Sequence, residues 1–408
     1  ANGVTETRSA LPGGMHAGEG YLIRKLGMEV GGIIHAGRSS WDLIRVAHRI
    51  ALRDTIMDVM DALHIYQDAL LKKASAHVET VMPYYTHGQQ GQPTTFAHHV
   101  HGFVCAAERD FERLHNAYRH MNISPAGAAA GTASRFPTNR QRVADLLGFD
   151  KTSTNTRDSS SNYDHMWEMA SSLSFVAASL GFLADEIVLW MGNEFGLVQL
   201  ADRYCGTSSI MTHKRNPTAA EQVQGLRTSL TGRVPTSYTP VDLLEAGRRV
   251  SNALRLCAGM VETLKVNQQA MLDTTIDSWA QASDLAAFLV ETRHLPIRMA
   301  HQIVGILVRL CEEEGIRPKD VQTQTLDRAS ILFLGEPLGL SQEDLSYAMN
   351  PEVAVATRRS VGSPSSQEMH DQISTSQEIL DANQKRLSNL REHSDRADQS
   401  LEEAIKTL

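Results

Sequence analysis

The sequence has few of the residues that mark disulfide-rich, metal-binding or nucleic-acid-binding proteins. Its four cysteines are widely scattered and include no Cys-x-x-Cys pair. They therefore predict reduced thiols, not a disulfide framework or a zinc site. The 39 Lys and Arg residues are outnumbered by 47 Asp and Glu residues, giving a net charge of −8. Such a balance argues against a large nucleic-acid-binding surface.

Long apolar runs and a targeting segment are also lacking. No apolar run approaches the roughly 20 residues needed to span a bilayer. The N-terminus has no basic stretch followed by an apolar one. With 42% hydrophobic and 21% charged residues, the composition is typical of a soluble globular protein. We therefore expect a cytoplasmic protein with neither a membrane nor a nucleic-acid partner.

What the sequence does contain is long helical periodicity. Apolar residues recur at alternating spacings of four and three within 52–70 and again within 166–190. This pattern is typical of helices packed along a neighbour, and the second segment predicts a rod of about 45 Å. No alternating strand pattern competes with it. Further helices are expected at about 96–118, 139–147, 219–231, 243–271, 285–314 and 366–406, with Pro296 kinking or splitting the fifth of these.

These patterns predict an all-α protein with a long central helix bundle and smaller helical caps. We assign 1–40 to a lead-in with a glycine-dense end, 41–270 to the central bundle and 271–408 to a C-terminal helical domain. The long helices exceed what a compact monomer needs, which favours a bundle continued into partner subunits. The periodicity alone indicates packing, and rods without enzymatic function share it.

A polar loop between two predicted helices carries groups suited to catalysis. Small and hydroxylated residues occupy 206–209, and a cation (Lys214) and an amide (Asn216) follow at alternate positions before Pro217. A core element would not cluster such residues. We expect a mobile loop that brings a hydroxyl group to an anionic ligand and covers it.

The order Ser-Ser-Ile-Met-x-x-Lys-x-Asn-Pro at 208–217 resembles the signature loop of the fumarase/aspartase superfamily. Members of that superfamily eliminate across a C–C bond of a succinyl group and release fumarate. The resemblance implies a fumarase/aspartase-like fold and no cofactor. Thr207 stands where the family generally has glycine, and Thr212 where it generally has proline. Neither change removes a reacting group.

By this resemblance, Ser208 is the catalytic base and Ser209 contacts the substrate beside it. The difficult step removes a proton from the carbon next to a carboxylate and leaves a dianionic aci-carboxylate. Lys214 and Asn216 are implied to bind the carboxylate on which charge accumulates. A serine hydroxyl is a weak base and needs activation by loop closure, N–H groups and a nearby cation. The structural alternative for Ser208 is a hydroxyl that caps the loop.

The segment 85–89, Tyr-Thr-His-Gly-Gln, resembles the Tyr-Thr-His-x-Gln segment of the same family. The resemblance implies that Thr86 and Gln89 bind substrate. It also implies that His87 polarises the site or relays the leaving-group proton, oriented by Glu221. Composition does not single out His87, because the chain has 17 histidines.

Three further segments resemble argininosuccinate lyases within this superfamily: 35–42, 85–96 and 350–364. The first reads His-Ala-Gly-Arg-Ser-Ser-Trp-Asp where those enzymes have His-Thr-Gly-Arg-Ser-Arg-Asn-Asp. By this match, Arg38 and Ser39 are implied to bind substrate.

Departures from the argininosuccinate lyase pattern bear on the substrate. Ser40, also assigned to substrate binding, replaces an arginine, and Trp41 replaces an asparagine that helps to hold substrate carboxylate. Tyr238 matches a substrate-facing tyrosine, but apolar residues replace the polar ones expected after it. Such changes should alter which N-substituted aspartate fits.

Other polar clusters allow structural explanations. The segments 127–131 and 155–164 resemble family loops near the substrate, and also suit a tight connection and a helix start. His98, His99 and His101 are close in sequence, but no acidic partner lies at a suitable spacing. We expect no metal site.

The leading hypothesis is a carbon–nitrogen lyase that eliminates an amine from an argininosuccinate-like N-substituted aspartate. Each active site would be shared by subunits of a homotetramer, as the resemblance implies. An adenylosuccinate lyase-type enzyme is one alternative, because His-Lys-Arg-Asn-Pro at 213–217 also resembles that branch. The other is a catalytically silent structural homologue, comparable to the lens crystallins recruited from this fold.

Overall fold

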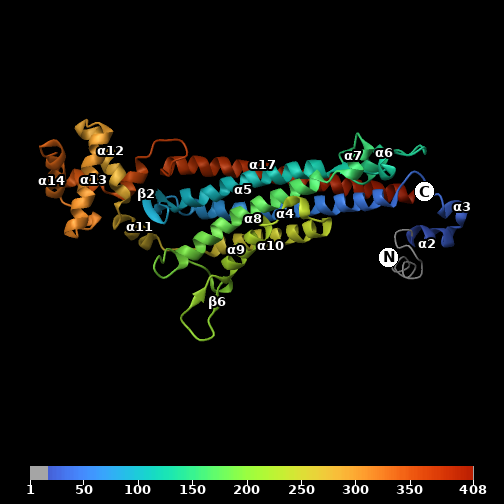
Figure 1. Cartoon of the computed structure of the whole chain (residues 1–408), viewed down its shortest axis with the longest axis horizontal. Coiled ribbons are helices and arrows are strands. Elements are labelled where there is room, and N and C mark those ends of the chain that lie inside the picture. The colour runs from blue at the N-terminus through green and yellow to red at the C-terminus, as the bar shows by residue number, and fades with distance from the viewer. Residues whose placement is uncertain (1–16, 408) are drawn as a thin grey trace.

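The computed structural model describes residues 17–407 and shows an elongated bundle of helices that run along its long axis (Figure 1). The all-α prediction is confirmed. The five longest helices are α4 (Ser40–Ser75), α5 (Phe96–Met121), α8 (Asp164–Met191), α10 (Pro240–Thr263) and α17 (Ser366–Lys406).

Helix α4 is the central rod. It begins at a capping box, in which the Ser39 side chain accepts a hydrogen bond from the N–H of Trp41 and the Asp42 carboxylate accepts one from the N–H of Ser39. Its 36 residues make it about 54 Å long at 1.5 Å per residue. Leu52, Ile56 and the other apolar residues of its predicted seam are buried against α5, α10 and α17. The two ends of α4 therefore mark distant parts of the molecule.

Helix α8 corrects one expectation from the sequence. Its 28 residues include a window with a mean hydropathy of 1.6, so it passes the length and composition test for a membrane span that we expected no segment to pass. Half of that window is buried, and the helix packs against α5, α9 (Thr218–Thr231) and α10 as a core helix does. Its outward face carries a stripe of exposed apolar side chains, called here the α8 stripe: Trp167, Phe175, Phe182 and Leu189.

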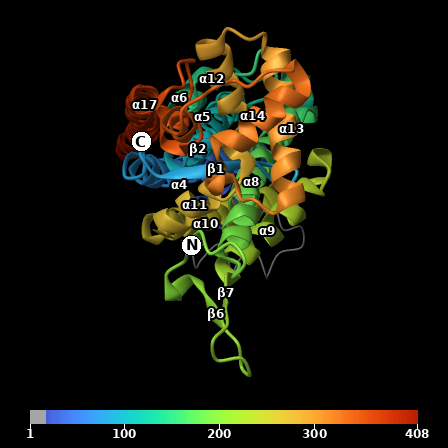
Figure 2. The same cartoon turned by 90° about the vertical axis from the view of Figure 1, so that its left-hand side faces the viewer.

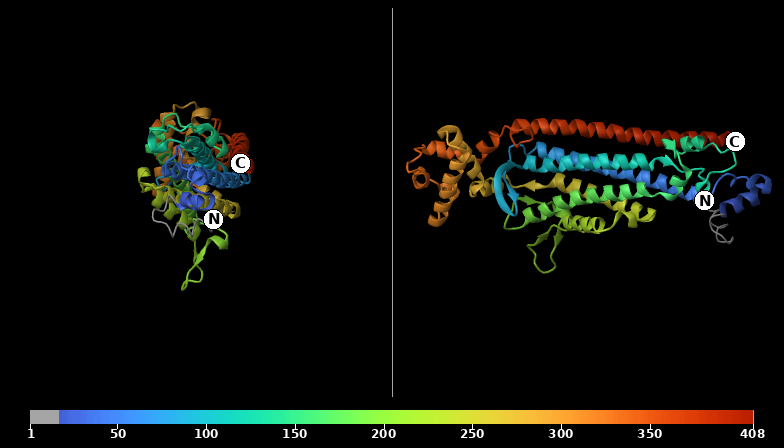
Figure 3. Two further views of the ribbon diagram at one scale, coloured as in Figure 1. Left: turned by 90° about the vertical axis from the view of Figure 1, so that its right-hand side faces the viewer. Right: turned by 45° about the horizontal axis from the view of Figure 1, so that its top comes forward.

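Helix α17 has the bounds that its sequence pattern predicts. It returns along α4 and α5 for the length of the bundle (Figure 3). Arg391 pairs with Asp58 and Asp61 of α4, and Arg386 pairs with Glu112 of α5. Few of its residues are buried, which explains its charged composition.

A β-ribbon occupies part of the stretch between the helices predicted at 52–70 and at 96–118. Strands β1 (Val81–Thr86) and β2 (Gln89–Thr95) pair antiparallel, and the two-residue turn between them has positive φ at both His87 (54°) and Gly88 (74°). Positive φ at both positions is the hairpin geometry that matches strand twist. Proline and glutamine hid this ribbon from the sequence analysis, because neither favours strands.

The remaining strands form three short pairs. They are β3 (Ile123–Ser124) with β4 (Lys151–Thr152), β5 (Val198–Gln199) with β8 (Lys265–Val266), and β6 (Gly206–Thr207) with β7 (Arg215–Asn216).

The single helix predicted at 243–271 is also wrong, because this segment forms parts of two helices. Helix α10 ends at Thr263, β8 pairs with β5, and α11 (Gln268–Ile276) starts afresh with the Asn267 side chain accepting from the N–H of Ala270. Pairing with a strand distant in sequence interrupts the helix at this point.

The caps complete the structure. Pro296 splits its segment into α12 (Ala282–Arg293) and α13 (Ile297–Glu314), as predicted. The C-terminal cap has its own buried cluster, which includes Leu285, Leu307 and Leu326. Residues 1–16 of the predicted lead-in lie outside the described residues. The other helices are α2 (Ala17–Leu26), α3 (Met28–Gly31), α6 (Arg140–Leu146), α7 (Thr156–Ser161), α9 (Thr218–Thr231), α14 (Thr323–Leu334), α15 (Gln342–Ala348) and α16 (Pro351–Ala356).

Candidate active site

Most of the residues assigned to the site from the sequence lie in three separate places of the chain (Figures 1 and 3). Residues 38–40 stand at the start of α4, and 86–89 form the β1–β2 turn beyond its other end. Residues 208–214 form a loop that projects from the side of the bundle (Figure 2). Because α4 is about 54 Å long, a single protomer does not bring the first two groups to one small molecule.

The loop with the serine pair is the tip of the β6–β7 hairpin. The Ser208 hydroxyl oxygen accepts hydrogen bonds from the backbone N–H groups of Met211 (3.0 Å) and Ile210 (3.4 Å). Donors aimed at an oxygen favour its anionic form, so this turn is suited to a serine that acts as a base. The same two bonds also close the loop, so the base and the loop-capping interpretations share one geometry.

The base of this hairpin is anchored by a residue that the sequence analysis missed. Arg215 donates to the carbonyl oxygen of Leu200 (3.0 Å) and pairs with Asp202. Gly206 is required nearby, because a Cβ there would lie 2.4 Å from the Thr218 hydroxyl oxygen. A rigid base therefore carries an exposed tip, with Ile210 83% exposed.

The charged groups of this region face solvent, and its amide group is partly covered. Lys214 is exposed in the loop, Asn216 is half-buried in β7, and Glu221 is exposed in the first turn of α9. In 17–407, no hydrogen bond or ion pair joins Glu221 to His87. The predicted pairing of these two side chains is therefore not made within one protomer.

The β1–β2 turn presents its polar groups outward. Thr86 pairs with Gln89 across the turn, and both are exposed, as is His87. The ring of Tyr85 packs edge-on against Phe195 at 6.2 Å between centroids, which ties the ribbon to the segment after α8. The turn is thus held at its base and open at its tip.

The start of α4 holds a strained loop. Asp42 is 3% exposed, and its carboxylate accepts the N–H groups of Ala129 (3.0 Å) and Ala130 (3.4 Å) as well as that of Ser39. Ala129 and Ala130 have φ of 47° and 68°, in the left-handed region that costs about 1 kcal/mol or more per residue. One buried carboxylate therefore fixes both the helix start and the small-residue loop. Its signal in the sequence is an Asp three residues after the capping Ser39.

A cavity of about 520 Å³ opens beside Arg38. Its charged lining comes from Arg38, Asp42 and Arg140, and the rest is largely apolar, including Ile34, Val46, Val143 and Leu147. Only one of the three assigned groups of residues reaches it. The cavity is therefore not a complete site.

Buried arginines on α4 were not expected from the sequence. Arg45, Arg49 and Arg53 follow one another at intervals of four residues and are 5%, 7% and 2% exposed. Arg53 donates to the Asn122 side chain (3.0 Å) and to the carbonyl oxygen of Gly148 (2.9 Å). Charged helix residues usually face solvent, so only their shared spacing signalled that they line one face.

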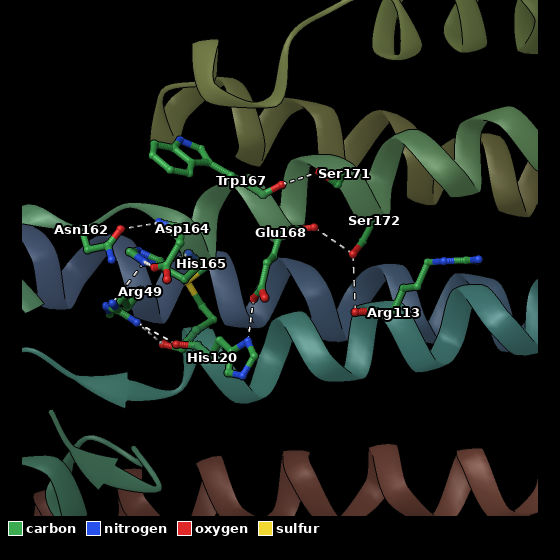
Figure 4. Close-up of polar contacts among 11 residues, drawn as sticks. Arg49, Arg113, His120, Asn162, Asp164, His165, Trp167, Glu168, Ser171 and Ser172 are labelled. Carbon is green, nitrogen blue, oxygen red and sulfur yellow. Dashed lines mark hydrogen bonds and ion pairs between the residues drawn. The ribbon is translucent and has the colours of Figure 1, made fainter. Parts of the chain in front are cut away.

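Arg49 joins three elements through such bonds (Figure 4). It donates to the carbonyl oxygens of His120 (2.9 Å) and Met121 (3.1 Å) and to Nδ1 of His165 (3.1 Å). An arginine only donates, so Nδ1 is the unprotonated nitrogen of that ring. Burial, together with the charges of Arg49 and Arg45, lowers the pKa of His165 to about 2. Asp164 lies 3.7 Å from the same nitrogen, but its side chain is 68% exposed and does not offset these effects.

Tyr238 does not face open solvent. It is 7% exposed, and the guanidinium of Arg233 lies 4.2 Å from its ring centroid. Arg233 is held in turn by Asp242 at 2.9 Å. Burial raises the pKa of Tyr238. The tyrosine is part of the main core at the turn between α9 and α10.

The three histidines of α5 bind separate partners. His98 bonds to a threonine side chain of β2 (2.9 Å), His99 to Glu186 (2.6 Å) and His101 to Ser376 (3.0 Å). Across residues 17–407, no three His, Cys, Asp or Glu side chains are arranged to hold a metal ion.

Comparison with known proteins identifies the family. A family model described as "Lyase" matches 14–232, and one described as "Argininosuccinate lyase C-terminal" matches 279–356. The argininosuccinate lyase of Methanosarcina barkeri is 34% identical over 403 residues, covering 94% of this chain and 80% of that protein. That of Methanothermobacter thermautotrophicus is 36% identical over 363 residues, covering 85% and 77%.

Solved structures agree. EDDS lyase in complex with formate superposes with a TM-score of 0.91 at 27% identity, covering 99% of this chain and 84% of that one. The class II fumarase of Schistosoma mansoni shares the fold alone, with a TM-score of 0.69 at 17% identity over 84% and 78% of the two chains. The chain therefore belongs to the fumarase/aspartase superfamily, in its argininosuccinate lyase-like branch of carbon–nitrogen lyases that release fumarate.

Proposed function

We propose that the protein eliminates an amine from an argininosuccinate-like N-substituted aspartate through an aci-carboxylate intermediate, with Ser208 as the base. The observation that carries this proposal is the hairpin tip. It places a hydroxyl oxygen that receives two N–H groups in the same loop as Lys214, with Asn216 at its base.

The proposed reaction uses each group once. Ser208 takes the proton from the carbon next to the β-carboxylate, and the electron pair moves into that carboxylate. Lys214 and Asn216 hold the two negative charges that result. The electrons then return to form the C=C bond of fumarate, the C–N bond breaks, and His87, oriented by Glu221, supplies the proton that the amine takes. Arg38, Ser39, Ser40, Thr86 and Gln89 would hold the rest of the substrate.

We further propose that the site is completed in a homotetramer. The start of α4 and the β1–β2 turn lie at opposite ends of a helix about 54 Å long, so they need different copies of the chain to meet. The α8 stripe supports association, because Phe175, Phe182 and Leu189 recur every seven residues and are 52%, 62% and 48% exposed. A spacing of seven residues keeps side chains on the face that contacts a parallel or antiparallel partner helix.

The four free cysteines support our proposal of a cytoplasmic protein.

The substitution Ser208→Ala tests the base. We expect it to lower kcat for fumarate release at least about 1,000-fold with unchanged circular dichroism, because removing a catalytic nucleophile or base leaves only binding and electrostatic catalysis. The matched control is Thr212→Ala, an exposed residue of the same tip that should keep its activity. The assay follows fumarate absorbance with argininosuccinate and a panel of N-substituted aspartates. Full activity of the Ser208→Ala protein would refute the base assignment.

A further inference from the structure

Trp41 is held in a defined orientation at the start of α4. It is the second residue of the helix and is 40% exposed. Its Nε1–H points at the carbonyl oxygen of Ser160 at 3.5 Å. The guanidinium of Arg45, one turn further on, lies 5.3 Å from the indole centroid and 4.0 Å from the ring centroid of Tyr163. The indole therefore has one side against a cation and a substantial part open.

The positive charge behind the indole is not neutralised by a carboxylate. Arg45 is 5% exposed and donates to the carbonyl oxygens of Ser160 and Asn162. Within 17–407, Arg45 forms no ion pair with a carboxylate. The N-terminus of α4 adds its own positive potential at this point. A second cation brought to the open side of Trp41 would be repelled by Arg45.

We infer that Trp41 is a specificity-determining residue, and that the N-substituent of the substrate packs on its open side as an uncharged apolar or aromatic group. The inference rests on the proposed function. The indole N–H is already directed at Ser160, so Trp41 offers no donor to a carboxylate. The carboxylates of the substrate have Lys214 and Asn216, which leaves the N-substituent as the part that meets an apolar surface.

A comparison of the repulsion from Arg45 with the attraction to the indole ring argues against a cationic substituent. Van der Waals contact with the open side adds about 3.5 Å to the 5.3 Å between Arg45 and the ring, so a second cation would stand about 9 Å from the guanidinium. At an effective dielectric constant of about 20, the repulsion weakens binding about twentyfold. The attraction of a cation to an exposed aromatic ring strengthens it only about two- to fivefold. Repulsion is the larger effect, and an aromatic substituent gains contact without it.

The test compares N-benzyl-aspartate with argininosuccinate, whose guanidinium is a cation. Binding is measured by calorimetry on the full chain carrying Ser208→Ala, so that turnover does not contribute heat. We expect N-benzyl-aspartate to bind at least about tenfold more tightly. Adding Trp41→Asn should bring the two affinities within about threefold, whereas Trp41→Phe, which keeps the ring, should preserve the preference. Ala47→Asn, at an exposed position of α4 that does not line the cavity beside Arg38, is the matched control and should change neither affinity.

Three outcomes would overturn the inference: equal binding of the two ligands, no binding of either, or a preference that Trp41→Asn leaves unchanged. The comparison within the Trp41-containing protein remains decisive even when a Trp41 variant fails to fold. Fumarate release by the unsubstituted enzyme tests the proposed function separately. Release from argininosuccinate in preference to N-benzyl-aspartate supports the proposed function and overturns the role of Trp41. Selective binding without release of fumarate from either compound or from any N-substituted aspartate of the panel supports the role of Trp41 and refutes the proposed function.

Discussion

Mixing two inactive variants tests whether the active site is shared between protomers. The substitutions Arg38→Ala and His87→Ala remove groups that lie beyond opposite ends of α4, a helix about 54 Å long. Both side chains are exposed, so neither change removes buried packing. Each variant alone should be inactive, because every site of a uniform assembly lacks one group.

Co-expression of the two variants in equal amounts should restore activity. A site is complete when its Arg38 comes from the His87→Ala chain and its His87 comes from the Arg38→Ala chain. With random assembly each condition holds in one half of cases, so about one quarter of the sites are complete. We therefore expect about a quarter of the unsubstituted kcat per site, measured as fumarate release after purification through a different tag on each chain.

The control is a chain that carries both substitutions, co-expressed with the unsubstituted chain. About a quarter of the sites should again be complete, because each complete site must then draw both Arg38 and His87 from unsubstituted chains. The two mixtures should therefore agree when the groups come from different protomers. If both groups came from one protomer, the first mixture would be inactive and the second would keep about half of its sites. That result would refute the argument from the length of α4.

Two further substitutions test the assembly and the buried histidine. Phe182→Lys on the α8 stripe should break the assembly into smaller species, because burying the exposed 62% of a phenylalanine contributes about 2–3 kcal/mol per copy. Light scattering measures the mass of the assembly, and an unchanged mass would contradict the proposed interface. His165→Gln, whose side-chain oxygen can still accept from Arg49, should remove a pH dependence of the free energy of unfolding. Because the folded pKa of about 2 lies below the unfolded value of about 6.5, this stability is present above pH 6.5 and falls by about 2 kcal/mol at pH 5. A difference between His165→Gln and the unsubstituted protein that does not vary with pH in denaturant titrations would contradict it.

Local patterns in the sequence determined most of the helical framework. The bounds of α17 and the split at Pro296 followed from apolar spacing and from the missing N–H of proline, which act within a few residues. The signature order at 208–217 was readable for the same reason, since its serines, lysine and asparagine lie within one loop. The capping box at Ser39 likewise depends only on residues within three positions of one another.

Only the tertiary structure decided how distant segments meet. The β1–β2 ribbon, the break after α10 and the bonds of Arg45 and Arg49 depend on partners far away in sequence, which periodicity does not specify. The separation of the site residues has the same origin. A sequence shows that residues 38–40 and 86–89 both resemble parts of one active site, but the straight length of α4 places them apart in a single chain. A rigid helix of 36 residues cannot fold back on itself, and the proposed site therefore needs other copies of the chain to bring these residues together.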